Sequence, residues 1–356
     1  MTTLRSFLPD WPRCRRFATA LGVGAIGGAL FKYLTAPIPW MLGAMCFTAA
    51  LAFLRVPFEV PKLLRTASLM MVGLLLGSAF TPDILDRIGA WAGAVVLNIV
   101  YLICVVTTGT VYFRKVARLD PASAYFASTP GGLVQMPFLA EAFGGSARDV
   151  SVVHALRIVV VVLAIPLYMR FTESALFLAN ARAVHVAGAP LGPLDALILI
   201  ATALAGYWLA RLCRLPAPPL IGTMILSIVV HATGLTHARP PAALFSAAQV
   251  VLGGAVGAYF IGLRLLALGR IAVISLAWTA VLLLIAALFA WIGEEIIGLP
   301  FYVLLVALSP GGQAEMGLVA LALGIEAAMV ATMHFFRSSA SFLLAPLMFR
   351  LLRRWM

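Results

Sequence analysis

The stretch that decides the fold is Ser128-Thr129-Pro130-Gly131-Gly132, which returns 180 residues later as Leu308-Ser309-Pro310-Gly311-Gly312. Each copy lies in the middle of an apolar segment, residues 119–144 and residues 299–324. Pro cannot continue a helix, and Gly adopts backbone conformations that strain other residues. The sequence therefore predicts one interrupted helix in each half of the chain.

Other uncommon residues repeat at the same offset, which indicates an internal duplication. The matched pairs are Gly73 and Gly253, Gly77 and Gly257, Phe80 and Phe260, Met136 and Met316, Gly144 and Gly324, His154 and His334, Arg157 and Arg337, and Pro166 and Pro346. Near the start of each half, Pro-Ile-Pro-Trp-Met-Leu-Gly at 37–43 is echoed by Pro-Ala-Pro-Pro-Leu-Ile-Gly at 216–222. We therefore expect two homologous membrane repeats, residues 1–180 and 181–356.

The composition is that of a membrane protein. Of the 356 residues, 63% are hydrophobic and 11% are charged, and the mean hydropathy is +1.06. A soluble domain carries about 25% charged residues. Apolar runs of about 20 residues, long enough to cross lipid, recur from Phe17 to Leu352. We expect an all-α polytopic protein of the bacterial inner (plasma) membrane, surrounded by the lipid bilayer and without a separate soluble domain.

The formal net charge of +12 would suggest a nucleic-acid partner for a soluble protein. Most Lys and Arg residues, however, lie in short loops and at the termini, where the positive-inside rule places them. We therefore expect no nucleic-acid partner. Arginines precede the first apolar run, residues 17–34, and no Ala-x-Ala-like cleavage site follows it. This pattern predicts an uncleaved first helix with the N-terminus in the cytoplasm.

In each predicted half, four helices precede the interrupted segment and one follows it. The expected helices are 17–35, 38–56, 63–80, 90–113 and 148–170, then 194–211, 218–236, 243–262, 270–292 and 327–350. Each arm beside Pro-Gly-Gly is about ten residues long, or ~15 Å of helix, which reaches the middle of a ~30 Å hydrocarbon core. A segment that re-enters gives five transmembrane helices per half and inverted halves, whereas one that crosses as a broken helix gives six and parallel halves. The inverted arrangement places the larger share of the 25 Lys and Arg residues in the cytoplasm, which favours it.

The interrupted segments are the candidate solute site. A single Pro-Gly-Gly could be a simple turn or kink. Broken backbone at membrane depth is tolerated, however, only where it is buried in protein or lines a cavity, and transporters use paired broken helices for this purpose. The candidate substrate-binding residues from these segments are Ser128, Thr129, Pro130, Gly131, Gly132, Gln135, Ser309, Pro310, Gly311, Gly312 and Gln313.

Charged residues follow at helical spacing. His154-x-x-Arg157 and His334-x-x-Arg337 each place both side chains on one helical face. Both arginines are expected near mid-depth, where the side chain does not readily reach the interface, and ionisable residues at such depth are functional candidates. Binding an anionic solute and neutralising an acid within the bundle are both open as their role.

Glu315 is the acidic residue expected deep in the membrane, and Gln135 stands at the matched position of the first half. It could form an ion pair with Arg337 or Arg157. It could instead take up and release a proton or a cation such as Na⁺, together with His154 and His334. The four cysteines are widely spaced and the five histidines do not cluster, so neither a metal site nor a cofactor is expected.

The two Pro-Gly-Gly segments, the His-x-x-Arg helices and the Pro-x-Pro motif at 37–43 together resemble the AbrB family of bacterial membrane proteins. The resemblance covers nearly the whole chain, and the second copy departs from it at 216–219 and at Glu315. The family is labelled both as an ammonia monooxygenase and as a membrane protein that affects gene expression. It differs from the soluble DNA-binding regulator of the same name, whose module this sequence lacks.

Duplication, interrupted helices and deep charges together favour a secondary transporter or exporter of a small, anionic metabolite. A membrane sensor or regulator that alters gene expression indirectly is the alternative. The monooxygenase label is disfavoured, because copper and iron sites need clustered His, Cys or carboxylate ligands, so we do not expect an enzyme. The sequence leaves open the substrate, the direction of transport, the coupling ion and whether the chain forms a homo-oligomer.

Overall fold

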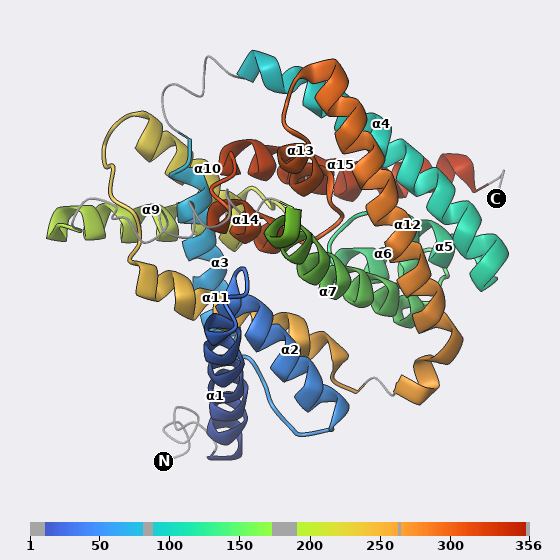
Figure 1. Ribbon diagram of the computed structural model, residues 1–356, viewed down its shortest axis with the longest axis horizontal. Helices are drawn as coiled ribbons and strands as arrows, with labels where there is room; N and C mark the ends of the chain where they lie inside the picture. The colour runs from blue at the N-terminus through green and yellow to red at the C-terminus, as the bar shows by residue number, and fades with distance from the viewer. Residues whose placement is uncertain (1–10, 81–87, 173–190, 263–264, 354–356) are drawn as a thin grey trace.

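The structure is a computed structural model, and it describes residues 11–80, 88–172, 191–262 and 265–353. Within these ranges the chain is helical and contains no strand (Figure 1). The first half holds α1 (Trp11–Tyr33), α2 (Pro39–Phe53), α3 (Lys62–Gly77), α4 (Ile88–Tyr112) with a π-helical turn (Phe113–Ala117), α5 (Pro121–Ser128), α6 (Gln135–Ala142) and α7 (Ala147–Thr172). The second holds α9 (Pro193–Leu212), α10 (Pro218–Ala232), α11 (Ala242–Gly257) with a 3₁₀ turn (Ala258–Phe260), α12 (Leu265–Ile297), α13 (Phe301–Leu308), α14 (Gln313–Ala322) and α15 (Ala327–Leu352).

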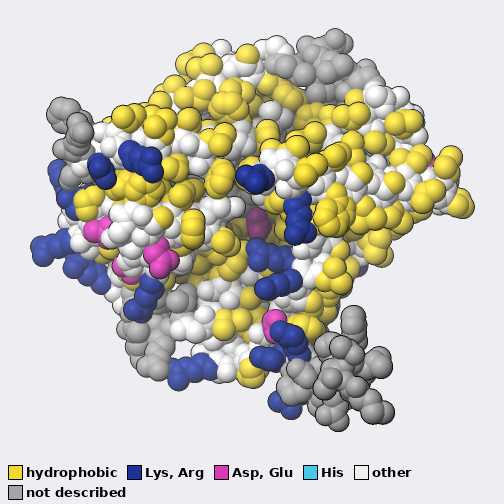
Figure 2. Space-filling model, turned by 180° about the vertical axis from the view of Figure 1, so that it is seen from behind, with side chains coloured by type: hydrophobic (Ala, Val, Ile, Leu, Met, Phe, Trp, Pro, Cys, Tyr) yellow, Lys and Arg dark blue, Asp and Glu magenta, His cyan; other side chains and the backbone are white. Residues whose placement is uncertain are grey.

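Six helical stretches of the described chain are long and apolar enough to cross a membrane. They are 91–117, 147–172, 193–212, 242–260, 269–297 and 327–352, and the shorter helices α2 and α10 are also apolar. Figure 2 shows apolar side chains covering the upper and right-hand parts of one face, while basic side chains gather along its left and lower edges and around its centre. A wide apolar exterior is expected of a protein surrounded by lipid. The expected all-α, multi-pass class is confirmed.

The predicted interruptions are present in both halves. The expected segment 119–144 consists of α5 and α6, and the expected segment 299–324 consists of α13 and α14. The chain leaves the helix at Thr129 (ψ 120°) and at Ser309 (ψ 136°), just before each proline. Extended backbone is what a residue before proline prefers, because the proline ring clashes with a helical predecessor.

Matched positions of the two halves share an unusual backbone conformation. Ile38 (φ 43°) and Ala217 (φ 45°) both adopt the left-handed conformation directly before the first residue of α2 and α10. This conformation is unfavourable for residues with a Cβ, most of all for β-branched isoleucine. Proline at the next position suits the start of a helix, since its fixed φ and missing N–H cost nothing there. The relative orientation of the halves stays a prediction.

Glycines bring pairs of helices into close contact. A Cβ on Gly27 of α1 or on Gly43 of α2 would meet the backbone of the other residue, and Gly206 of α9 and Gly222 of α10 are related in the same way. Small residues permit this approach of helices within membranes. Gly22, in the middle of α1, is different, because a Cβ there would meet nothing within 4 Å.

The helices pack into two bundles, each with members from both halves. The first bundle is α1–α3 with α9–α11, in which α2 packs on α1 and α11, and α10 packs on α9 and α3. The second bundle is α4–α7 with α12–α15, in which α12 packs on α4, α7 and α13. Figure 1 shows the first bundle at the left and bottom and the second at the centre and right. Contacts between the bundles include those of α3 with α14 and α15, and of α7 with α2 and α11.

Candidate functional site

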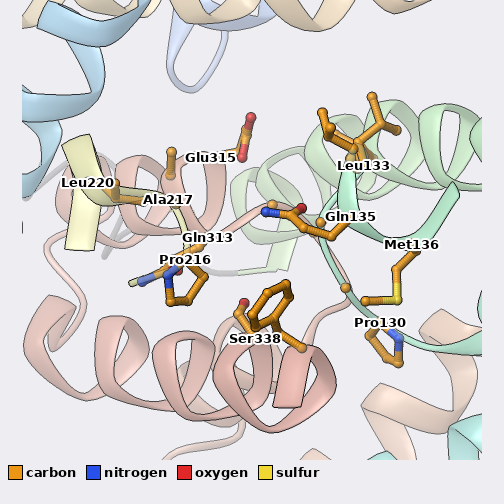
Figure 3. A pocket seen from close by; sticks show the side chains of 18 of the residues that line it. Pro130, Leu133, Gln135, Met136, Pro216, Ala217, Leu220, Gln313, Glu315 and Ser338 are labelled. Carbon is orange, nitrogen blue, oxygen red and sulfur yellow. The ribbon is translucent and has the colours of Figure 1, made fainter. Parts of the chain in front are cut away.

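A cavity of about 230 Å³ lies where the two interrupted segments meet. Its wall includes residues 130–136 of the first segment and residues 311–315 of the second. Further lining residues come from α3, α7, α10 and α15, so both bundles contribute. Figure 3 shows Gln135 reaching across this space toward the side on which Gln313 and Glu315 lie.

The hydroxyl groups before each proline complete the ends of the helices rather than face the cavity. Ser128 Oγ and Thr129 Oγ1 each donate to the carbonyl of Tyr125 over 2.8 Å, and Ser309 Oγ donates to the carbonyl of Val306 over 2.8 Å. The last carbonyls of a helix lack partners within the helix, and these hydroxyls supply them.

Of the predicted site residues, ten line the cavity and six do not. The ten are Pro130, Gly131, Gly132, Gln135, Arg157, Gly311, Gly312, Gln313, Glu315 and Arg337. The six that lie outside the lining are Ser128, Thr129, His154, Ser309, Pro310 and His334.

The second glycine of each motif makes room for the side chain three residues later. A Cβ on Gly132 would collide with Oε1 of Gln135, and a Cβ on Gly312 would collide with Oε2 of Glu315. Both side chains therefore fold back over the break at the start of a half-helix. In the second half this places a carboxylate in the first turn of α14, where the helix dipole favours negative charge.

Arg337 on α15 ties the second break together. Its side chain is buried, with Nη1 donating to the carbonyls of Leu308 (3.0 Å) and Ser309 (2.8 Å). Its Nη2 donates to the carbonyl of Gly311 (3.3 Å) and to Nδ1 of His334 (2.8 Å). The guanidinium thus neutralises the carbonyl end of α13, the negative end of the helix dipole.

Arg157 on α7 occupies the matched position with a different environment. It is equally buried, yet its hydrogen bond is a long one, from Nη2 to the carbonyl of Gly131 over 3.4 Å. Its Nε and Nη1 have no partner among the described residues, and neither does Nδ1 of His154. His154 donates through Nε2 to the carbonyl of Phe126 over 3.0 Å, as His334 does to Val306. The two His-x-x-Arg pairs therefore match in position but not in hydrogen bonding.

Glu315 forms no ion pair with either buried arginine. An ion pair elsewhere in the described part of the chain joins Arg13 and Glu59, at 3.9 Å. Of the two alternatives for Glu315, the ion pair with Arg337 or Arg157 is therefore not formed in this structure. Figure 2 shows an acidic side chain on the floor of a central hollow with basic side chains on its rim.

Sequence reasoning missed one charged residue of the cavity, Arg65 of α3. Arg65 donates from Nη2 to the hydroxyl of Tyr259 over 2.8 Å and lies over that ring. Both residues line the cavity, as Glu315 does. No sequence pattern indicated this, because Arg65 has Phe245 at the matched position and its partner is 194 residues away. The lining thus contains three arginines and one glutamate.

A metal centre is not formed by the described residues, which hold no group of three His, Cys, Asp or Glu side chains arranged around a metal ion. The residues that line this cavity do not supply the ligands that a copper or iron monooxygenase needs.

The fold and the site define a multi-pass helical membrane protein with a cavity between two interrupted helices. The chain belongs to the AbrB family, described as "Transition state regulatory protein AbrB", whose match covers residues 40–353. It is 27% identical over 353 residues to "Uncharacterized protein YhjN" of Bacillus subtilis (strain 168), covering 93% of this chain and 92% of that protein. It is 24% identical over 314 residues to "Putative regulator AbrB" of Escherichia coli (strain K12), covering 87% and 88% of the two chains.

Proposed function

We propose that this protein is a secondary transporter of a small anionic solute and that the cavity between the Pro-Gly-Gly segments is its solute site. The observation that carries the proposal is the lining, in which interrupted helices from both halves meet beside three arginines and one glutamate. Interrupted helices of this kind build midplane solute sites in transporters. The excess of positive charge favours an anion, and a volume of about 230 Å³ suits a small one.

The packing of the helices supports alternating access. The interrupted segments belong to the second bundle, while Arg65, Leu220 and Tyr259 line the cavity from the first. A cavity at the boundary between two bundles is exposed to one side or the other when one bundle moves against its neighbour. In this proposal, a displacement of α14 against α3 opens and closes the site.

Glu315 is the proposed coupling residue, with a proton or Na⁺ as the coupling ion. Its carboxylate lines the cavity without an ion pair to Arg157 or Arg337. A carboxylate in that setting can bind and release a cation as the site changes its exposure. The amide of Gln135 at the matched position cannot bind and release a proton in this way, so we assign ion coupling to the second half.

A regulatory role is the second candidate, because one relative carries the name of a regulator. A transporter that sets the concentration of a metabolite would alter gene expression without contacting DNA. The two candidates therefore differ in whether a change in gene expression is preceded by movement of a solute across the membrane.

The proposal is tested by comparing metabolites in cells with the gene, without it, and with the variant Arg157→Gln. We expect one or a few small anions to change in concentration on deletion and to remain changed in the variant. Measuring transcripts in the same cultures separates the candidates. Transcript changes without any change in small anions would contradict the transporter and favour the regulator.

A further inference from the structure

The two buried arginines of the cavity are not equivalent, and the difference identifies the solute-binding one. Arg337 has acceptors on both terminal nitrogens, three backbone carbonyls and one imidazole nitrogen, and of its three nitrogens Nε alone has none among the described residues. Arg157 has one acceptor at 3.4 Å, and two of its three nitrogens have none. Buried donors without partners are rare because they are costly, and in a cavity wall they can bind an acceptor that enters the cavity.

A second unpartnered donor lies in the same cavity, on the opposite segment. Nε2 of Gln313 is buried and has no hydrogen-bond partner in the described part of the chain. Gln313 is the first residue of α14, and Figure 3 shows it beside the cavity on the side of Glu315. Two residues with unpartnered donors thus line the same cavity, Arg157 from α7 and Gln313 from α14, and an acceptor bound between them would join the two halves.

We propose that Arg157 and Gln313 bind the carboxylate of a monocarboxylate solute, and that Arg337 is a structural residue. The inference deepens the proposed function and rests on it. A guanidinium matches the planar, two-oxygen acceptor of a carboxylate. Glu315 faces the same cavity, and its negative charge disfavours multiply charged anions such as phosphate and sulfate. One further donor from Gln313 completes the set for a carboxylate.

The test measures the binding of defined anions to the purified full chain in lipid nanodiscs. Thermal stabilisation is recorded with monocarboxylates and dicarboxylates of two to six carbon atoms, with and without an amino group, and with inorganic phosphate, sulfate and chloride. The variants are Arg157→Lys, Gln313→Leu and Arg337→Lys, and Arg148→Lys serves as the control because Arg148 is exposed on the same helix as Arg157.

We expect saturable stabilisation by at least one monocarboxylate, and an increase in its Kd of about tenfold or more in Arg157→Lys and Gln313→Leu. Arg337→Lys, despite a lower Tm without ligand, keeps the wild-type Kd within about threefold, as does Arg148→Lys. The inference is overturned if no carboxylate binds, if only phosphate or sulfate binds, or if Arg337→Lys alone loses affinity. Uptake into proteoliposomes separates the two proposals: binding that depends on Arg157 without flux contradicts the transporter and leaves the binding site standing. Flux of a solute whose KM is unchanged in Arg157→Lys supports the transporter and contradicts the assignment of Arg157 to the binding site.

Discussion

Arg337 donates from Nη2 to Nδ1 of His334 over 2.8 Å. Because a guanidinium has no acceptor, Nδ1 must accept, and the ring proton lies on Nε2, which donates to the carbonyl of Val306. The pair therefore links α15 to both the last turn of α13 and the break that follows it. A role in holding the interrupted segment together follows from this geometry.

Arg337→Lys is expected to lower stability. An ammonium cannot reach Leu308, Ser309 and Gly311 in the fork geometry of the guanidinium, and each buried acceptor left unpaired costs about 1–3 kcal/mol. Thermal denaturation in detergent should show a clearly reduced Tm. Arg157→Lys is the matched control and should unfold near the wild-type temperature. Equal Tm values for the wild type and Arg337→Lys would contradict a structural role.

The interruptions were predictable from sequence because Pro and Gly act locally on the backbone. Pro130 and Pro310 end α5 and α13 whatever the tertiary structure around them. The environments of Arg157 and Arg337 could not be predicted in this way. They depend on the direction of the backbone carbonyls at 308–311 and at 131, which tertiary packing sets. The same His-x-x-Arg spacing in both halves therefore does not reveal that the two arginines differ in hydrogen bonding. The contact between Arg65 and Tyr259 could not be predicted for the same reason, since it joins α3 to the turn after α11.

Glu315→Gln tests the coupling residue. We expect the variant to lose accumulation driven by an ion gradient while it keeps exchange of solute, because glutamine resembles the protonated acid but cannot release a proton. Its Tm should stay close to that of the wild type, since Glu315 has no ion pair with Arg337 or Arg157. Counterflow and gradient-driven uptake should be measured on the same preparation. Full accumulation by a stable Glu315→Gln protein would exclude this residue from coupling.

Gly27→Ala and Gly22→Ala form a matched pair within α1. A Cβ at Gly27 would strike the carbonyl of Gly43 on α2, whereas one at Gly22 meets nothing within 4 Å. We expect Gly27→Ala to destabilise by about 1–3 kcal/mol through overpacking. Gly22→Ala should be neutral or should stabilise by up to about 1 kcal/mol, because alanine is the better helix former. Chemical denaturation monitored by tryptophan fluorescence checks both, and equal effects would contradict the close α1–α2 contact.

The inverted arrangement of the halves is tested by thiol labelling in intact cells. It places Arg211 and Arg264 in the cytoplasm and Glu294 outside; Arg264 lies outside the described residues. Cys213 is exposed beside Arg211 and is a natural reporter. In this arrangement a membrane-impermeant reagent leaves Cys213 unmodified and labels Glu294→Cys in a background without other cysteines. Labelling of Cys213 with protection of Glu294→Cys would favour parallel halves.

In the proposed function, an anionic solute crosses the membrane through the cavity between the two interrupted helices. The most direct measurement is uptake of radiolabelled monocarboxylates into proteoliposomes that contain the purified protein, with an imposed proton or sodium gradient. We expect saturable uptake of at least one of them, absent from protein-free liposomes and strongly reduced by Arg157→Lys but not by Arg148→Lys. Uptake equal to that of protein-free liposomes for every anion, under both gradients and with a protein shown to be folded, would contradict it.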